Sequence, residues 1–166
     1  MRLSEMKTLM GSQNIEVDLT SIKVALNTLE ERYADSSIEI KEVASGFRMQ
    51  IRESYGDCLY PLWNDASSRL SKALMETISI IAYKQPVTRG DIEDIRGVTV
   101  STQIIRSLLD REWVKVAGYR DVPGRPALYE TTKNFLNDLN LKSINDLPPL
   151  PEALPADEAL DQLEAG

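Results

Sequence analysis

The sequence contains no histidine and only one cysteine, Cys58, among its 166 residues. The absence of histidine excludes histidine-based acid–base catalysis, activation of a nucleophile by histidine, and zinc sites with histidine ligands. A single cysteine cannot form an internal disulfide, which is typical of proteins from a reducing cytosol. The sequence also lacks an apolar run near the roughly 20 residues that span a bilayer, and its first residues lack the pattern of a secretory signal. We therefore expect a cytoplasmic location and no membrane partner.

Basic residues are also few, with 19 against 26 acidic residues and a net charge of −7. Six of the acidic residues lie between Asp146 and Gly166, where no basic residue occurs, which leaves 20 acidic and 19 basic residues in 1–145. A protein that binds DNA usually carries a basic surplus over its folded part. The charge balance therefore argues against tight sequence-independent DNA binding.

No arrangement of residues in the sequence predicts catalysis. The glycines are scattered and form no phosphate-binding loop pattern. The best pair of carboxylates, Asp91 and Asp94, fits the start of a helix, where acidic side chains complement the positive end of the helix dipole. Cys58 has no histidine to activate it and is interpreted as a small buried residue. We therefore predict no enzyme, no catalytic residue, no cofactor and no metal site.

Proline is concentrated near the C-terminus, where four of the eight prolines lie between Pro148 and Pro155. Proline removes backbone donors and disfavours helix in the residue before it. Together with the acidic residues that follow, this composition predicts a disordered, acidic, proline-rich tail over residues 146–166.

The remaining residues predict the same order of elements twice, and the second copy, residues 67–145, is the clearer one. Its first helix ends before Pro86, and its second begins at a capping box of Thr88 and Asp91 and ends at Gly97, before a third helix. The apolar residues expected to face the core are Leu70, Leu74, Ile78 and Ile81, then Ile92 and Ile95, then Ile105, Leu108 and Leu109.

Two strands and a last helix complete the second copy. Alternation predicts a strand over Trp113–Val116, and the Pro-Gly sequence in residues 121–126 predicts a tight turn before a return strand over residues 127–129. The final helix contains Phe135. Two helices, a turn, a third helix and a two-stranded wing form the winged-helix arrangement, a variant of the helix-turn-helix.

The first copy, residues 1–66, is shorter. It predicts a helix that ends at Gly11, a longer helix over residues 19–33 with Ile22, Leu26 and Leu29 facing inward, and a hairpin around Ser45-Gly46. A helix equivalent to the leading helix of the second copy is missing, so we expect either an upstream start or a second chain that covers the exposed face. The predicted fold class is thus α+β and mainly helical, with two tandem winged-helix domains that each carry a β-hairpin wing.

A winged helix raises the alternative of a DNA-binding transcriptional regulator. A recognition helix needs side chains that reach base edges, surrounded by phosphate contacts. The third helix of the second copy offers Gln103 and Arg106 but has no net charge, and neither has the helix over residues 19–33. The predicted wing is slightly basic through Lys115, Arg120 and Arg125. This alternative stays open at a lower weight.

Several stretches of the second copy closely resemble the segregation and condensation protein B (ScpB) family. They run in the family's order over about 70 residues: Ile80 to Arg89, Ile95 to Val98, Gly118 to Pro126, Tyr129 to Thr132, and Phe135 to Leu150. The first copy resembles the family mainly in its pattern, with residues 42–49 the closest match.

The resemblance implies a non-enzymatic subunit of the bacterial SMC–kleisin condensin, which acts in chromosome condensation and segregation during cell division. It implies a homodimer that binds the kleisin ScpA and, through ScpA, the SMC ATPase, in the cytoplasm at the nucleoid. Contact with DNA would be indirect or weak. Arg89 and Arg96 would pair with acidic residues of the kleisin, and Tyr83 would be an apolar anchor. The candidate kleisin-binding residues are Tyr83, Gln85, Pro86, Arg89, Arg96, Gly97, Val98, Arg120, Pro123, Gly124 and Arg125.

Overall fold

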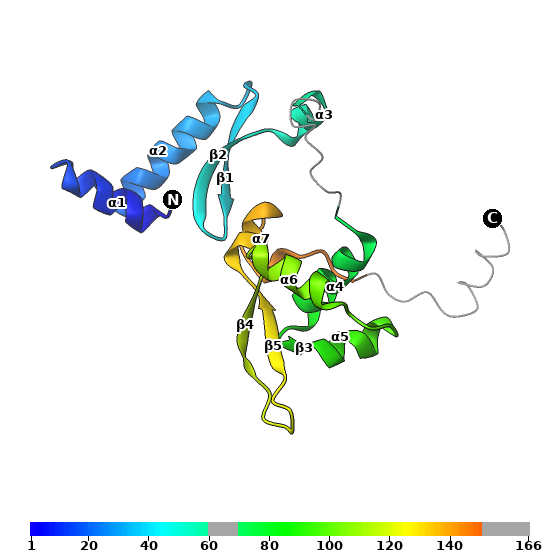
Figure 1. Cartoon of the computed structure of the whole chain (residues 1–166). Coiled ribbons are helices and arrows are strands. Elements are labelled where there is room, and N and C mark those ends of the chain that lie inside the picture. The colour runs from blue at the N-terminus through cyan, green and yellow to red at the C-terminus, as the bar shows by residue number, and fades with distance from the viewer. Residues whose placement is uncertain (60–69, 151–166) are drawn as a thin grey trace.

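A computed structural model of the chain describes residues 1–59 and 70–150 (Figure 1). The expected boundary between the two copies, at residues 66 and 67, and residues 151–166 of the expected tail lie outside this part. The fold mixes helices with small antiparallel sheets. In the described ranges, no helix has both the length and the apolar character needed to cross a membrane.

The N-terminal half forms a helical pair beside a hairpin. Its elements are α1 (Leu3–Ser12), α2 (Leu19–Arg32), β1 (Ile38–Val43), β2 (Gly46–Ile51), a 3-10 helix (Glu53–Tyr55) and α3 (Gly56–Leu59). The side chain of Asp18 begins α2 by accepting a hydrogen bond from the backbone N of Ser21 at 2.7 Å. The strands pair from Val43 opposite Gly46 outward, so the expected helices and hairpin are confirmed.

This half buries few apolar side chains. Ile22 of α2 and Val43 of β1 are its buried hydrophobic residues within the described range. Leu29, which we expected to face inward, is exposed, and α2 packs mainly on α1 and β1. Cys58 is exposed as well, which corrects the expectation of a buried residue. Its four-residue helix α3 buries no side chain.

The C-terminal half contains the three expected helices and the expected pair of antiparallel strands. Its elements are α4 (Lys72–Lys84), β3 (Val87–Thr88), α5 (Arg89–Arg96), α6 (Thr102–Asp110), β4 (Val114–Tyr119), β5 (Ala127–Thr131), α7 (Lys133–Asp138) and the 3-10 helix η3 (Ile144–Asp146). The strands form an antiparallel sheet in the order β3-β5-β4. The capping box of Thr88 and Asp91 is confirmed, and Gly97 ends α5 in the left-handed conformation.

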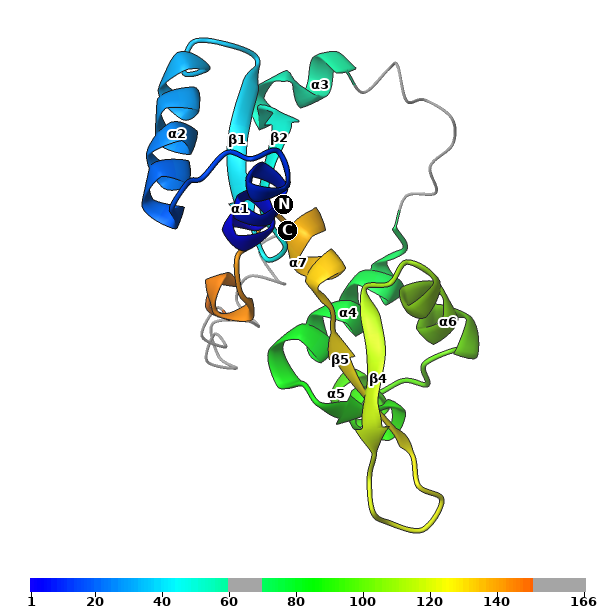
Figure 2. The same cartoon turned by 90° about the vertical axis from the view of Figure 1, so that its left-hand side faces the viewer.

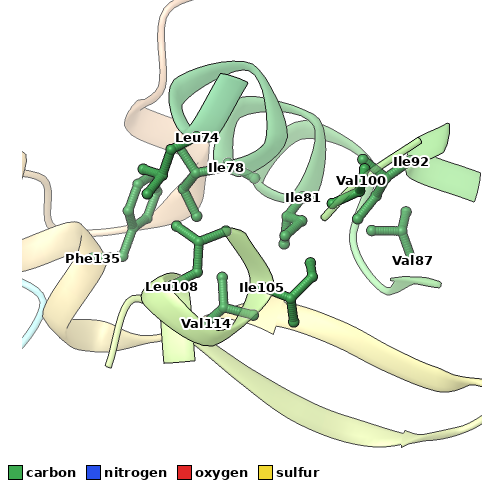
Figure 3. Close-up of a cluster of buried hydrophobic side chains, with 11 residues drawn as sticks. Leu74, Ile78, Ile81, Val87, Ile92, Val100, Ile105, Leu108, Val114 and Phe135 are labelled. Carbon is green, nitrogen blue, oxygen red and sulfur yellow. The ribbon is translucent and has the colours of Figure 1, made fainter. Parts of the chain in front are cut away.

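The hydrophobic core lies in the C-terminal half (Figure 3). Leu74, Ile78 and Ile81 of α4 point toward α6, where Ile105 and Leu108 meet them. Val87, Ile92 and Val100 fill the end of the core beside α5, and Val114 and Phe135 belong to the same cluster.

Three residues expected in this core are exposed. Leu70 precedes α4, and Leu109 lies at the edge of the buried face of α6. Ile95 is 54% exposed although Ile92, one turn earlier, is fully buried. Ile92 is the residue of α5 that the core buries, and Ile95 lies outside the part of the helix that the core covers.

The chain continues to pack beyond the expected start of the tail. Ile144 and Leu147 contact the hydrophobic core. The hydroxyl of Tyr83 donates a hydrogen bond to the carbonyl O of Pro148 at 2.6 Å. Leu147 and Pro148, at the start of the segment that we expected to be disordered, therefore contact the C-terminal half.

The turn of the β1–β2 hairpin contacts α7 and the residues after it (Figures 1 and 2). The backbone N of Ser45 donates to Asn137 Oδ1 at 3.0 Å, and that of Ala44 donates to the carbonyl O of Leu141 at 2.9 Å. Arg48 Nη2 donates to the carbonyl O of Asn137 at 2.9 Å. We call this set the hairpin contact. It joins the two halves of the chain.

Candidate partner-binding surface

The N-terminal end of α5 is bound to Arg120, which follows β4 at the start of the β4–β5 loop. Asp91 accepts two hydrogen bonds from the guanidinium group of Arg120, at 2.9 and 2.6 Å, and a third from the backbone N of Thr88 at 2.8 Å. Arg120 and then Thr88 lower the pKa of Asp91 from 3.8 to about 2. The bond to Asp91 also raises the pKa of Arg120. Arg120 is thus committed to an intramolecular pair.

Arg89 organises the loop that follows α5. Its Nε donates to Glu93 Oε1 at 2.9 Å, and the same oxygen accepts the backbone N–H of Val100 at 2.8 Å. The bond from Val100 and then that from Arg89 lower the pKa of Glu93. This arrangement holds the loop in which Val98 is 56% exposed. Gly97 has φ = 68°, a left-handed conformation that glycine adopts without strain.

Arg96 lies almost covered at the other end of α5. Its side chain is 9% exposed, and Nη2 donates to Glu76 Oε2 on α4 at 2.9 Å. Its Nε and Nη1 are buried and have no hydrogen-bond partner. Lys72, one turn before Glu76, lies 4.0 Å from the other carboxylate oxygen.

Arg96 also lines a shallow open groove of about 550 Å³ between α4 and α5. We call it the α4–α5 groove. Its apolar walls are Met75 and Ile80 of α4 and Ile95 of α5, and Lys72, Glu76 and Ser79 complete it. This combination of apolar walls and a covered guanidinium group suits a peptide better than a small polar metabolite.

The remaining candidates lie elsewhere. Tyr83 and Gln85 are half-buried at the end of α4, and Gln85 Oε1 accepts hydrogen bonds from Thr131 N at 2.6 Å and Thr131 Oγ1 at 2.9 Å. Pro86 is exposed and follows a cis peptide bond. In the loop of the wing, Pro123, Gly124 and Arg125 are exposed, and Gly124 has φ = 85°.

The candidates therefore divide among four places instead of forming one patch. Arg89 and Arg120 lie at the start of α5, Arg96 to Val98 at its end, Tyr83 to Pro86 beside residues 144–150, and Pro123 to Arg125 in the loop between β4 and β5. The sequence reasoning missed Glu76, the acidic partner of Arg96, and Met75 and Ile95, the walls of the groove. The spacing of Lys72 and Glu76 was a usable signal for an ion pair along a helix. The pairing with Arg96 was not predictable, since it joins two helices.

Comparison with known proteins assigns the chain to a family. The family model of the segregation and condensation complex subunit ScpB matches residues 1–150. The chain belongs to the ScpB family. A segregation and condensation protein B homolog from Coxiella burnetii is 46% identical over 160 residues, which cover 96% of this chain and 74% of that protein. The segregation and condensation protein B of Syntrophotalea carbinolica is 40% identical over 82% of this chain and 70% of its own length.

A solved structure is also similar to the chain. ScpB from Mycobacterium tuberculosis is 28% identical, and the match covers 80% of this chain and 82% of that one with a TM-score of 0.41. Membership of the ScpB family identifies the chain as a segregation and condensation protein, with a role in chromosome segregation and condensation.

Proposed function

We propose that this ScpB-family chain is a non-enzymatic subunit of a bacterial SMC–kleisin condensin that binds the kleisin ScpA and, through it, the SMC ATPase. The observation that carries the proposal is the family match over residues 1–150, because it includes both halves of the described fold. A protein-binding role also agrees with the α4–α5 groove, where apolar side chains lie exposed beside arginine. Arginine and methionine are enriched at protein interfaces.

The proposal includes two tandem winged-helix domains and a homodimer. The order of helices and strands in residues 72–131 supports the second winged helix, and α1, α2 and the β1–β2 hairpin support a shorter first one. Exposed apolar side chains on the N-terminal half support a dimer that covers them, among them Leu9, Val24 and Met49. A dimer of this kind would act at the nucleoid in the cytoplasm.

The charges of the wing favour a protein partner over DNA. Lys115 pairs with Glu130 at 2.8 Å, and Arg120 pairs with Asp91. Two of the three basic residues that suggested phosphate contact are therefore neutralised within the chain. Arg111, directly after α6, lies over the ring of Trp113, with 5.6 Å from its Cζ to the ring centroid. DNA contact would then be weak or indirect, and the transcriptional regulator is the less supported alternative.

The test is reconstitution with purified components. We expect the full chain and full-length ScpA to elute together in size-exclusion chromatography, and the pair to bind the head domains of the SMC ATPase. A parallel gel-shift assay with duplex DNA is expected to show no retardation by the chain alone at physiological salt. Failure to bind ScpA, together with tight binding of a specific duplex, would favour the regulator instead.

A further inference from the structure

Arg96 is the one side chain in the described residues with buried polar atoms that lack a hydrogen-bond partner. Folded proteins pair most of their buried donors, so an exception needs a physical reason. The guanidinium group has five N–H donors in a planar fork. Nη2 donates to Glu76, whereas Nε and Nη1 have no acceptor. The side chain is only 9% exposed.

The surroundings of Arg96 are suited to an additional chain segment. Met75, which is 41% exposed, and Ile95 line the same groove from two helices. Methionine adapts its shape to different apolar partners, and both side chains are exposed enough to move aside. Lys72 stands at the rim with 92% of its side chain exposed. The groove thus contains two cations against the single carboxylate of Glu76.

We propose that the α4–α5 groove binds a short segment of the kleisin partner in which a large aliphatic side chain lies next to a carboxylate. This inference rests on the proposed function, because it gives the kleisin a defined site. The aliphatic side chain would insert between Met75 and Ile95. The carboxylate would pair with Lys72 and supply acceptors to the fork of Arg96, which binds carboxylates in bidentate fashion.

The charges in the groove distinguish three kinds of partner segment: basic, neutral apolar and acidic. A basic segment would be repelled by Lys72 and Arg96, and a neutral apolar segment could offer Arg96 only backbone carbonyl oxygens, which form weaker hydrogen bonds with a guanidinium group than a carboxylate does. An acidic, aliphatic segment complements both the apolar walls and the arginine. Arginine is one of the residue types enriched among the side chains that dominate the binding energy of protein interfaces.

The experiment measures the affinity of the full chain for full-length ScpA by isothermal titration calorimetry. Ile95→Asp places a negative charge on the groove wall, and Lys72→Glu reverses the charge of the rim. Both positions are exposed, so each variant is expected to keep the circular dichroism spectrum of the wild type. We expect Ile95→Asp to weaken binding at least tenfold and Lys72→Glu to weaken it severalfold, more strongly at low salt.

The matched control is Val116→Asp, which places the same charge on an exposed apolar residue of β4, outside the groove. Its affinity for ScpA is expected to equal that of the wild type. Arg96→Lys keeps the positive charge but removes the fork, and it is expected to weaken binding as well. Its melting temperature, measured in parallel, separates this effect from a loss of stability.

Four results would overturn the inference. Equal affinity of the groove variants and the wild type would leave the proposed function standing and remove the groove from it. Absence of binding by the wild type would remove both. If Ile95→Asp changes the oligomeric state without ScpA, or if deletion of residues 151–166 speeds amide exchange in α4 and α5, the groove belongs to a second copy or to the chain's own acidic segment.

Discussion

At the residue scale, Asp91 has two roles: it caps α5, and it binds Arg120 at the start of the β4–β5 loop. Its side chain is 30% exposed and that of Arg120 is 42% exposed, so solvent screens part of their attraction. The pKa of Asp91 is lowered to about 2 from 3.8. A carboxyl group with a lowered pKa in the folded state stabilises the fold above its unfolded pKa. That stabilisation is lost as pH falls from about 4 toward 2.

We expect Arg120→Ala to lower the free energy of unfolding at pH 7 by about 1 kcal/mol, after a discount for the exposure of the pair. The variant should also lose less stability than the wild type between pH 4 and pH 2, since Asp91 would then titrate closer to its ordinary pKa. Urea unfolding followed by circular dichroism across this pH range measures both effects. Lys115→Ala, which removes the more exposed pair with Glu130, is the control and is expected to change stability by less than about 0.5 kcal/mol. An identical pH profile for Arg120→Ala and the wild type would contradict the role of the pair.

At the element scale, the hairpin contact connects segments about 90 residues apart in the sequence. Arg48 Nη2 makes two hydrogen bonds across it, to the carbonyl O of Asn137 and to Asn140 Oδ1 at 2.8 Å. Hydrogen bonds from a charged donor contribute more than neutral ones, roughly 1.5–3 kcal/mol where they are well shielded. The hydrogen bonds of Arg48 therefore help to hold the β1–β2 hairpin against the C-terminal half.

We expect Arg48→Ala to destabilise the chain by about 1 kcal/mol and to speed amide exchange at Ala44 and Ser45, whose N–H groups donate across the same contact. Hydrogen exchange resolved by residue in NMR tests this directly. Arg106→Ala, on the exposed face of α6, serves as the control and should leave both amides unchanged. Unaltered protection in Arg48→Ala would mean that the backbone bonds alone hold the hairpin.

Some features of the fold were predictable from the sequence, and others were not. The start and end of α5 were predictable, because Thr88, Asp91 and Gly97 act within one short helix. The exposure of Ile95 was not predictable. Helical spacing identifies the apolar face of a helix, but it does not show how much of that face the neighbouring elements cover. The pairs of Arg96 with Glu76 and of Arg48 with Asn137 join separate elements, and no local pattern encodes them. The sequence therefore suggested candidate residues but could not show that they lie in four separate places of the fold.

At the scale of the whole molecule, the two halves differ in how much apolar surface they bury. The hydrophobic cluster of eleven buried residues lies entirely within residues 74–135. In residues 1–59, Ile22 and Val43 are the buried hydrophobic residues, while Leu9, Val24 and Met49 lie exposed. Burial of an apolar side chain contributes about 1.5–3 kcal/mol, and the net stability of a domain is only about 5–15 kcal/mol. The N-terminal half therefore depends on contacts outside itself.

We expect a fragment of residues 70–150 to unfold cooperatively on heating, at a temperature that does not depend on its concentration. A fragment of residues 1–59 should lack a cooperative transition when dilute, and should gain structure only as it self-associates, because a partner copy would cover its exposed apolar side chains. Circular dichroism melts at several concentrations, with sedimentation equilibrium for the oligomeric state, distinguish these behaviours. In the full chain, Val24→Asp should then weaken self-association, whereas Val116→Asp in the other half should not. A dilute, monomeric 1–59 fragment that melts cooperatively would contradict the argument, and the exposed side chains would need no partner to explain them.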